Sequence, residues 1–326
     1  MSQKIQLESL ISVSEEYNDD TPVSESILES CSDFVVSTID MANMESLSSV
    51  YLRAKDVSAA IKLEGVAMEA DGVNKSIIRT ILDWIQSVVK WIVTKVKELW
   101  TKIMGLFGHK TEKEIVKDIE KNVPECTPEV AENLDIASQI ADLSKQITEL
   151  SNEYDTWFAS TRVTREGIIA ELKKYDEGSP ERTAFAIQLQ DLQKLSHDRF
   201  ADQQKKLEPL VARLNALRKQ KRSKHEAFEH GIPVNMANVH NVASFITLGR
   251  QQVEDMKKTI TVYKKYVEQY SREYYNTADI DIQLHYMDLI RSYKSQIEEL
   301  NKRVASTMSN IANAAVSLSS VSRMAG

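Results

Sequence analysis

Turn-forming residues are scarce in this chain, which has 9 glycines and 6 prolines among its 326 residues. A β-sheet needs a turn every few residues, and glycine and proline supply many of the backbone conformations that turns require. Leucine, isoleucine, lysine, glutamate and glutamine are abundant instead. The sequence therefore predicts an all-α fold made of long helices, and its length allows a sizeable core.

The first long hairpin is predicted over about 130–228, where apolar residues recur in steps of three and four, as in a coiled-coil seam. The segment DEGSPE at 176–181 should reverse the chain. There Gly178 suits a left-handed backbone, Ser179 an N-cap and Pro180 the first helical position. The seam residues of the two helices are Ile136, Ile140, Leu143, Ile147, Leu150, Tyr154, Trp157, Ile168, Leu172 and Tyr175, then Phe185, Leu189, Leu192, Leu195, Leu207, Leu210, Leu214 and Leu217.

A second hairpin of similar length is predicted after the break EHGIPVN at 229–235, with its turn in NTADID at 276–281. Helices of about forty-five residues reach roughly 65 to 70 Å. We therefore expect residues 111–326 to form rods of long antiparallel hairpins, an architecture that usually serves spacing and assembly. The seam residues here are Val253, Met256, Ile260, Tyr263, Val267, Tyr270 and Tyr274, then Ile282, Tyr286, Leu289, Tyr293, Leu300, Val304, Ile311 and Leu318.

The segment 76–107 is predicted to be one continuous amphipathic helix within a region 70–110, because its polar residues advance by three or four. Its other face carries 18 apolar residues, including Trp84, Trp91, Trp100 and Phe107. Charged residues interrupt every apolar run, which argues against a conventional membrane-spanning helix. The apolar face could be buried in the protein's own core, lie in a membrane interface, or contact another copy or a partner protein.

The charge of the chain is unevenly distributed. Residues 1–69 hold 13 acidic and 4 basic side chains, whereas residues 70–326 hold 35 acidic and 37 basic ones. The balances are −9 and +2, so the acidity of the chain is confined to its first fifth. Such a segment suits either a mostly solvated extension or a detachable or chaperoning segment.

The sequence contains no pattern typical of catalysis, and we expect a non-enzymatic protein without cofactor or metal. His225 and His230 are five residues apart, whereas two zinc ligands on one helix face are four apart. Cys31 and Cys126 match no metal-ligand spacing and suggest reduced thiols of an intracellular compartment. Tyr263, Tyr266, Tyr270 and Tyr274 could stack on bases, although packing is the simpler use.

A dense basic run could contact nucleic acid, or could instead complement the dipole at the end of the second long helix. Its residues are Arg213, Arg218, Lys219, Lys221, Arg222 and Lys224.

The segment EGVAMEADG at 64–72 lies where the acidic part of the chain ends. Its two glycines favour an extended, accessible backbone that a protease can bind. The order of acidic leader, Ala67-Met68-Glu69, tryptophan-rich helix and long coiled coils resembles that of the internal head proteins of giant tailed bacteriophages. In that group the prohead protease removes a leader by cutting after a glutamate that has a small residue two places earlier. Ala67-Met68-Glu69 followed by Ala70 fits this rule. Glu16, Glu153, Glu181, Glu229 and Glu273 fit it too, but they do not lie at the charge switch.

The resemblance implies a structural protein packaged inside the phage head, made as a precursor with a leader over 1–69 and delivered to the host with the genome. Its partners would be the prohead protease, capsid and scaffold proteins, and packaged DNA or a membrane surface, and a homo-oligomer is expected. It would occupy the host cytoplasm before assembly and the virion interior afterwards. The alternative is a helical membrane-active, pore-forming-like protein that inserts residues 76–107 into a bilayer. A plain intracellular coiled-coil scaffold is a third possibility.

Overall fold

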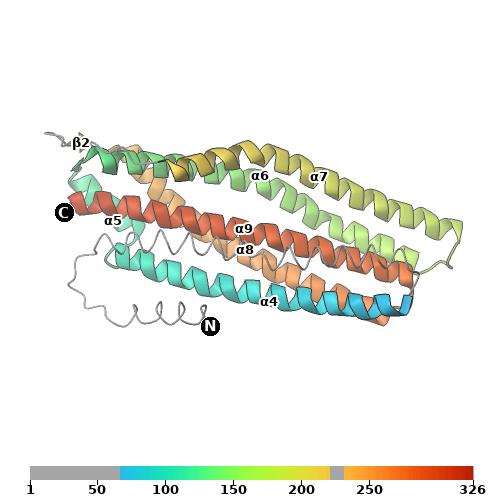
Figure 1. The fold of residues 1–326 in the computed structure, drawn as a ribbon. Helices are drawn as coiled ribbons and strands as arrows, with labels where there is room; N and C mark the ends of the chain where they lie inside the picture. The colour runs from blue at the N-terminus through green and yellow to red at the C-terminus, as the bar shows by residue number, and fades with distance from the viewer. Residues whose placement is uncertain (1–66, 221–230, 326) are drawn as a thin grey trace.

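The computed structural model describes residues 67–220 and 231–325, with side chains from residue 76 onward. Helices make up nearly all of this part of the chain, so the all-α prediction is confirmed (Figure 1). Two strands of two residues each, β1 and β2, pair antiparallel. The elements are α4 (Ala67–Leu106), α5 (Glu112–Lys121), β1 (Glu125–Cys126), α6 (Pro128–Leu172), α7 (Pro180–Lys219), β2 (Ile232–Pro233), α8 (Met236–Asn276) and α9 (Ile280–Ala325).

The turn between α6 and α7 has the features that its sequence predicts. Gly178 adopts a positive φ of 80°, a conformation that side chains with a Cβ rarely adopt. Ser179 is the N-cap of α7 and accepts a hydrogen bond from the backbone N–H of Arg182, while Pro180 opens the helix. The turn between α8 and α9 also falls within the predicted segment. Each pair of long helices is therefore joined by a short, sharp connection.

Helix α9 lies at the centre of the structure, in contact with α4, α5, α6 and α8. Figure 1 shows it running between α4 on one side and the α6–α7 pair on the other. Its second half is buried around most of its circumference, and small residues such as Ala305, Ser309 and Ala315 let the neighbouring helices approach it. The helices expected to form rods therefore pack as one elongated bundle.

The predicted seam residues are buried more completely in α8 and α9 than in α6 and α7. Every seam residue predicted for α9 is buried, and in α8 only Met256 is partly exposed. In contrast, Leu195 of α7 is 45% exposed, because α7 is an outer helix that packs mainly on α6. The supercoiling that the heptads suggest stays a prediction.

Helices α8 and α9 approach closely at Gly249. A Cβ built on this glycine would lie 2.7 Å from Cδ1 of Ile311, well inside the distance of normal contact. The absence of a side chain at position 249 therefore lets Ile311 of α9 pack directly against the backbone of α8.

The structure also departs from the expected element boundaries. Helix α4 begins nine residues before the predicted position 76, and α7 ends at Lys219 although the return helix was expected to reach about 228. Residues 221–230, with His225 and His230, lie outside the described part of the chain. Helix α5 was not predicted, although Thr111 and Glu114 form a capping box at its start.

Candidate functional site: helix α4 and its surroundings

The residues of the proposed cleavage site, Ala67, Met68, Glu69 and Ala70, form the first turn of α4. An extended backbone was expected here, and the structure instead places this segment in a helix. The first turn of a helix lacks intrahelical partners for its backbone N–H groups, and helix ends fray. Binding to a protease would therefore require unwinding of one terminal turn and not of the whole helix.

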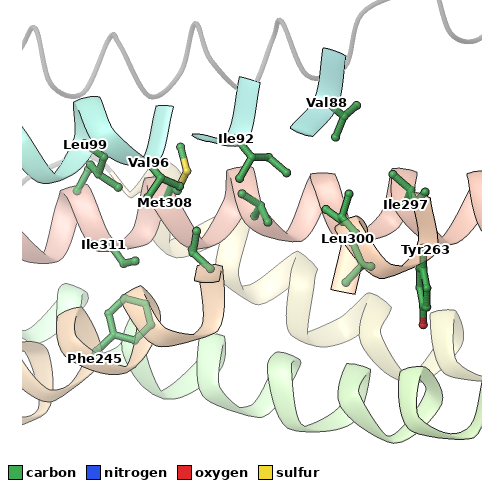
Figure 2. Packing of buried hydrophobic residues seen from close by; sticks show 14 of the residues in the cluster. Val88, Ile92, Val96, Leu99, Phe245, Tyr263, Ile297, Leu300, Met308 and Ile311 are labelled. Carbon is green, nitrogen blue, oxygen red and sulfur yellow. The ribbon is translucent and has the colours of Figure 1, made fainter. Parts of the chain in front are cut away.

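The apolar face of α4 is covered by the protein's own bundle. Every buried side chain in the described part of α4 is apolar, and these residues contact α8 and α9. Figure 2 shows Val88, Ile92, Val96 and Leu99 pointing from α4 toward α9. Phe107, which follows the helix, is only 3% exposed. Three environments were possible for the apolar face of α4: the protein's own core, a membrane interface, or another protein surface. The structure shows this face buried in the protein's own core.

The tryptophans of α4 lie at the edges of this buried face and are partly exposed. The Arg250 guanidinium of α8 lies over the Trp100 ring, 4.9 Å from its centre, and the Lys294 ammonium of α9 lies 5.5 Å from the centre of Trp84. At 100° per residue, Trp84 and Trp100 point about 160° apart around α4. The two rings therefore cover opposite edges of the α4 interface, and each is held by a cation from a different helix.

Helix α4 ends in a tight reversal that leads directly into α5. Gly108 and His109 have positive φ values of 56° and 62°. Lys110 then donates a hydrogen bond of 2.9 Å to Asp118 of α5, and this bond lowers the pKa of the carboxyl group. The backbone N–H of Thr111 donates to the Glu114 carboxylate at 2.7 Å. These contacts fix the direction in which the chain leaves α4.

The basic run is divided by the structure. Arg213 and Lys219 are exposed on α7, whereas Arg218 reaches inward to α9. Its guanidinium donates to Oδ1 of Asn310 at 2.7 Å and to Oγ of Ser306 at 2.9 Å, and burial lowers its pKa. Arg218 is therefore a structural contact between α7 and α9 and not part of an exposed basic surface. The remaining three residues, Lys221, Arg222 and Lys224, lie outside the described part of the chain.

The tyrosines that could have stacked on bases are mostly used in packing. Tyr263, Tyr270 and Tyr274 are each less than 5% exposed, and Tyr263 lies edge-on to Tyr293 of α9, with ring centres 5.1 Å apart. Burial raises the pKa of Tyr293 to about 12. These rings form an aromatic layer between α8 and α9, which leaves little of their surface for a ligand.

Several polar contacts inside the bundle were not anticipated from the sequence. Arg165 of α6 is 5% exposed, lies over the ring of Phe158 and donates a hydrogen bond to Ser196 of α7. Arg303 of α9 is paired with Asp155 of α6. No spacing rule separates these arginines from surface arginines, because the partners lie on helices distant in sequence.

A groove of about 570 Å³ lies between α6 and α8, with residues of α9 along it. The Asp155–Arg303 pair, Gln252, Tyr263 and Tyr266 are among its lining residues. The paired charges offset each other, and the pKa of Tyr263 is raised by burial, so this hydroxyl stays protonated near neutral pH. Two of its threonine hydroxyls donate to backbone carbonyl oxygens of their own helices, Thr148 to Ser144 and Thr259 to Asp255.

Features that would indicate a metal site or a membrane span are not found in residues 67–220 and 231–325. No group of three or more metal-ligating side chains occurs there. None of the described helices has an apolar stretch long enough to cross a bilayer. Cys126 is buried with a free thiol whose pKa is raised by burial, while Cys31 lies outside the described residues. Comparison of the chain with protein-family models, curated protein sequences and solved structures gives no match.

Proposed function

We propose that this chain is a non-enzymatic structural protein of a bacteriophage head, made as a precursor and cleaved after Glu69. The observation that carries the proposal is the coincidence of three boundaries. The charge of the chain changes sign at residue 69, the motif Ala67-Met68-Glu69 ends there, and α4 begins at Ala67. A cut after Glu69 would remove only the first three residues of the described bundle.

The electrostatics of the two parts agree with this role. A leader with a charge of −9 is attracted to a basic scaffold surface and repelled by DNA. The remaining chain has a charge of +2 and can lie close to packed DNA without strong repulsion. Removing the leader would therefore end the attraction to a basic scaffold surface and let the remaining chain lie next to the DNA.

The packing of the bundle supports a structural role as well. Five helices of 40 to 46 residues share one core, and one of the five, α9, lies at its centre. Such a bundle of long helices suits a protein that spaces other components or fills volume in a particle. This role does not need a deep ligand pocket. Under this proposal, residues 70–326 enter the mature particle, and they retain all of the described bundle except its first three residues.

Mass spectrometry of mature particles from the native source tests the proposal. Trypsin would release residues 63–75 as one peptide from an uncleaved chain, since the neighbouring sites are Lys62 and Lys75. The processed chain would instead yield a peptide of residues 70–75 that begins at Ala70. Finding the 63–75 peptide and leader peptides in mature particles, without the 70–75 form, would disprove the proposal.

A pair of variants tests the position of the cut. Glu69→Gln should leave the leader attached when the protein is produced together with the prohead protease. Glu64→Gln should be processed normally, because Lys62, two places before it, is not a small residue. Cleavage that is lost equally in both variants, or in neither, would place the site elsewhere.

A membrane-active protein that inserts residues 76–107 is the second candidate, and it is favoured by the buried face of α4, whose side chains are all apolar. To reach a bilayer, α4 would have to expose ten large apolar side chains that are now buried, counting Phe107. At about 1.5 to 3 kcal/mol for each, release would cost on the order of 15 kcal/mol or more in water. This cost favours the structural role unless a membrane compensates it.

Dye release from anionic liposomes separates the two functions. In the membrane-active case, the full chain causes leakage, and substitution of Ile85 and Ile92 by aspartate abolishes it. Substitution of the exposed Val93 by aspartate serves as the control on the same helix. Leakage that is absent from the native chain at all protein concentrations would eliminate this candidate.

A further inference from the structure

Two large apolar side chains are strongly exposed at the start of α9. Ile280 is 59% exposed and Leu284 is 53% exposed. They are four residues apart, so they lie on one side of the helix, one turn after the other. They lie at the end of the bundle that contains the α8–α9 turn (Figure 1).

The same end of the bundle receives the chain that precedes α4. Two contacts fix the register: Lys294 lies over Trp84, 210 positions earlier, and Ser319 donates to the carbonyl oxygen of Leu106, 213 positions earlier. Because these separations are nearly equal, α4 and α9 run parallel. Positions 67–70 of α4 are then level with about 277–283 of α9. Helix α4 therefore begins level with Ile280 and Leu284.

The direction of the two exposed side chains follows from the helical period. Ile280 precedes Lys294 by 14 positions and Leu284 precedes it by 10. At 100° per residue they point within about 40° and 80° of Lys294 around the helix axis. Lys294 itself faces Trp84 of α4. Ile280 and Leu284 thus form a small apolar surface at this end of α9, on the side turned toward α4, which we call the edge patch.

We propose that the leader of the precursor covers the edge patch. The leader is joined to α4 at the level of the patch, so its effective concentration there is high even if its affinity as a separate peptide is low. It contains short apolar groups, among them Ile27, Leu28, Phe34, Val35 and Val36. Asp279 and Asp281 flank Ile280, so the contact would be made by apolar side chains and not by opposite charges.

Cleavage after Glu69 would then expose the edge patch as a contact surface of the mature protein. This consequence depends on the proposed processing, whereas the docking of the leader does not. The partner gained on cleavage would be an apolar protein surface in the assembled particle. Processing would in this way both discard an acidic segment and activate a hydrophobic contact.

Limited trypsin digestion of the uncleaved full chain tests the docking without any phage protease. Arg53, Lys55 and Lys62 offer cleavage sites in the leader. The double variant Ile280→Asp/Leu284→Asp should be cut there several-fold faster than the native chain, because cleavage follows the population of the undocked state. Val163→Asp, which changes an exposed apolar residue of α6, should be cut at the native rate. Equal rates in all three proteins would overturn the proposal.

A photo-crosslinking amino acid at position 284 provides a second readout that does not depend on destabilisation. Crosslinked peptides from residues 1–66 of the same chain are expected. Crosslinks confined to a second copy, or to solvent-derived products, would overturn the docking proposal. A leader that docks but is retained in mature particles would instead contradict only the proposed cleavage.

Discussion

The guanidinium of Arg250 on α8 lies 4.9 Å from the centre of the Trp100 ring on α4, so a cation from one helix covers an aromatic ring of another. A partly exposed pair of this kind should contribute about 0.5 to 1 kcal/mol. A double-mutant cycle with Trp100→Ala and Arg250→Ala, measured by urea unfolding, should return a coupling energy of that size. The same cycle with Trp91→Ala, on the other edge of the α4 interface, should give a coupling near zero.

Alanine at position 249 should destabilise the protein by about 1 to 3 kcal/mol, because its Cβ would overlap Ile311 and force α8 and α9 apart. Gly167 provides the matched control, since a Cβ there would meet no atom within 4 Å. Replacing this helical glycine by alanine should stabilise the protein by about 0.5 to 1 kcal/mol. Free energies of unfolding that shift in the same direction for both variants would contradict the close helix approach.

Arg218→Ala should lower the free energy of unfolding by about 1 to 3 kcal/mol, because it removes the bonds to Ser306 and Asn310 and leaves their oxygens without these donors. Arg213→Ala, on the exposed side of α7, should stay within about 0.5 kcal/mol of the native protein. Chemical denaturation measures both. Equal effects would mean that Arg218 does not hold α7 to α9 in solution.

Stability should decrease in mildly acidic solution because of His285 on α9. Burial, aided by the charge of Arg182, lowers its pKa below the ordinary 6.5, although Asp288, Asp281 and Asp279 act in the opposite direction. The folded protein therefore favours neutral imidazole, and below pH 6.5 the unfolded chain binds the proton more readily. The contribution of His285 to the free energy of unfolding is intact above this pH. It is lost as the pH falls toward the pKa that His285 has in the folded protein.

The variant His285→Gln should flatten this part of the pH dependence. Urea unfolding at about pH 7.5 and about pH 5.5 compares the native chain with the variant, and the difference between the two pH values isolates this group. His197→Gln, which changes an exposed histidine of α7, is the matched substitution control. An unchanged pH profile in His285→Gln would rule out the role of this side chain.

Local signals in the sequence were sufficient for most of the fold. The glycine, serine and proline at 178–180 act within one turn of chain, so their effect on α7 could be predicted. The periodicity of α8 and α9 identified their buried faces for the same reason, since each apolar residue repeats the direction of its neighbours one turn away.

Such local signals could not predict which side chains from distant helices contact each other. Arg218 is part of a basic run in the sequence, but Asn310 is 92 positions away, and nothing local indicates that the two meet. The covering of α4 was also left open, because a tryptophan-bearing apolar face has the same pattern whether a membrane or a bundle covers it. Helix α5 is different: Thr111 and Glu114 at the spacing of a capping box could have revealed its start.

The central place of α9 has a consequence for synthesis. Its carboxyl-terminal part meets the end of α4 through Ser319 and Leu106, so the interior closes only when segments more than two hundred positions apart come together. Such distant contacts form slowly, and a nascent chain that has emerged only as far as α8 lacks the helix around which the others assemble. Until about residue 320 has left the ribosome, the part of the apolar face of α4 that packs on the end of α9 stays uncovered, even where α8 already lies against the same helix.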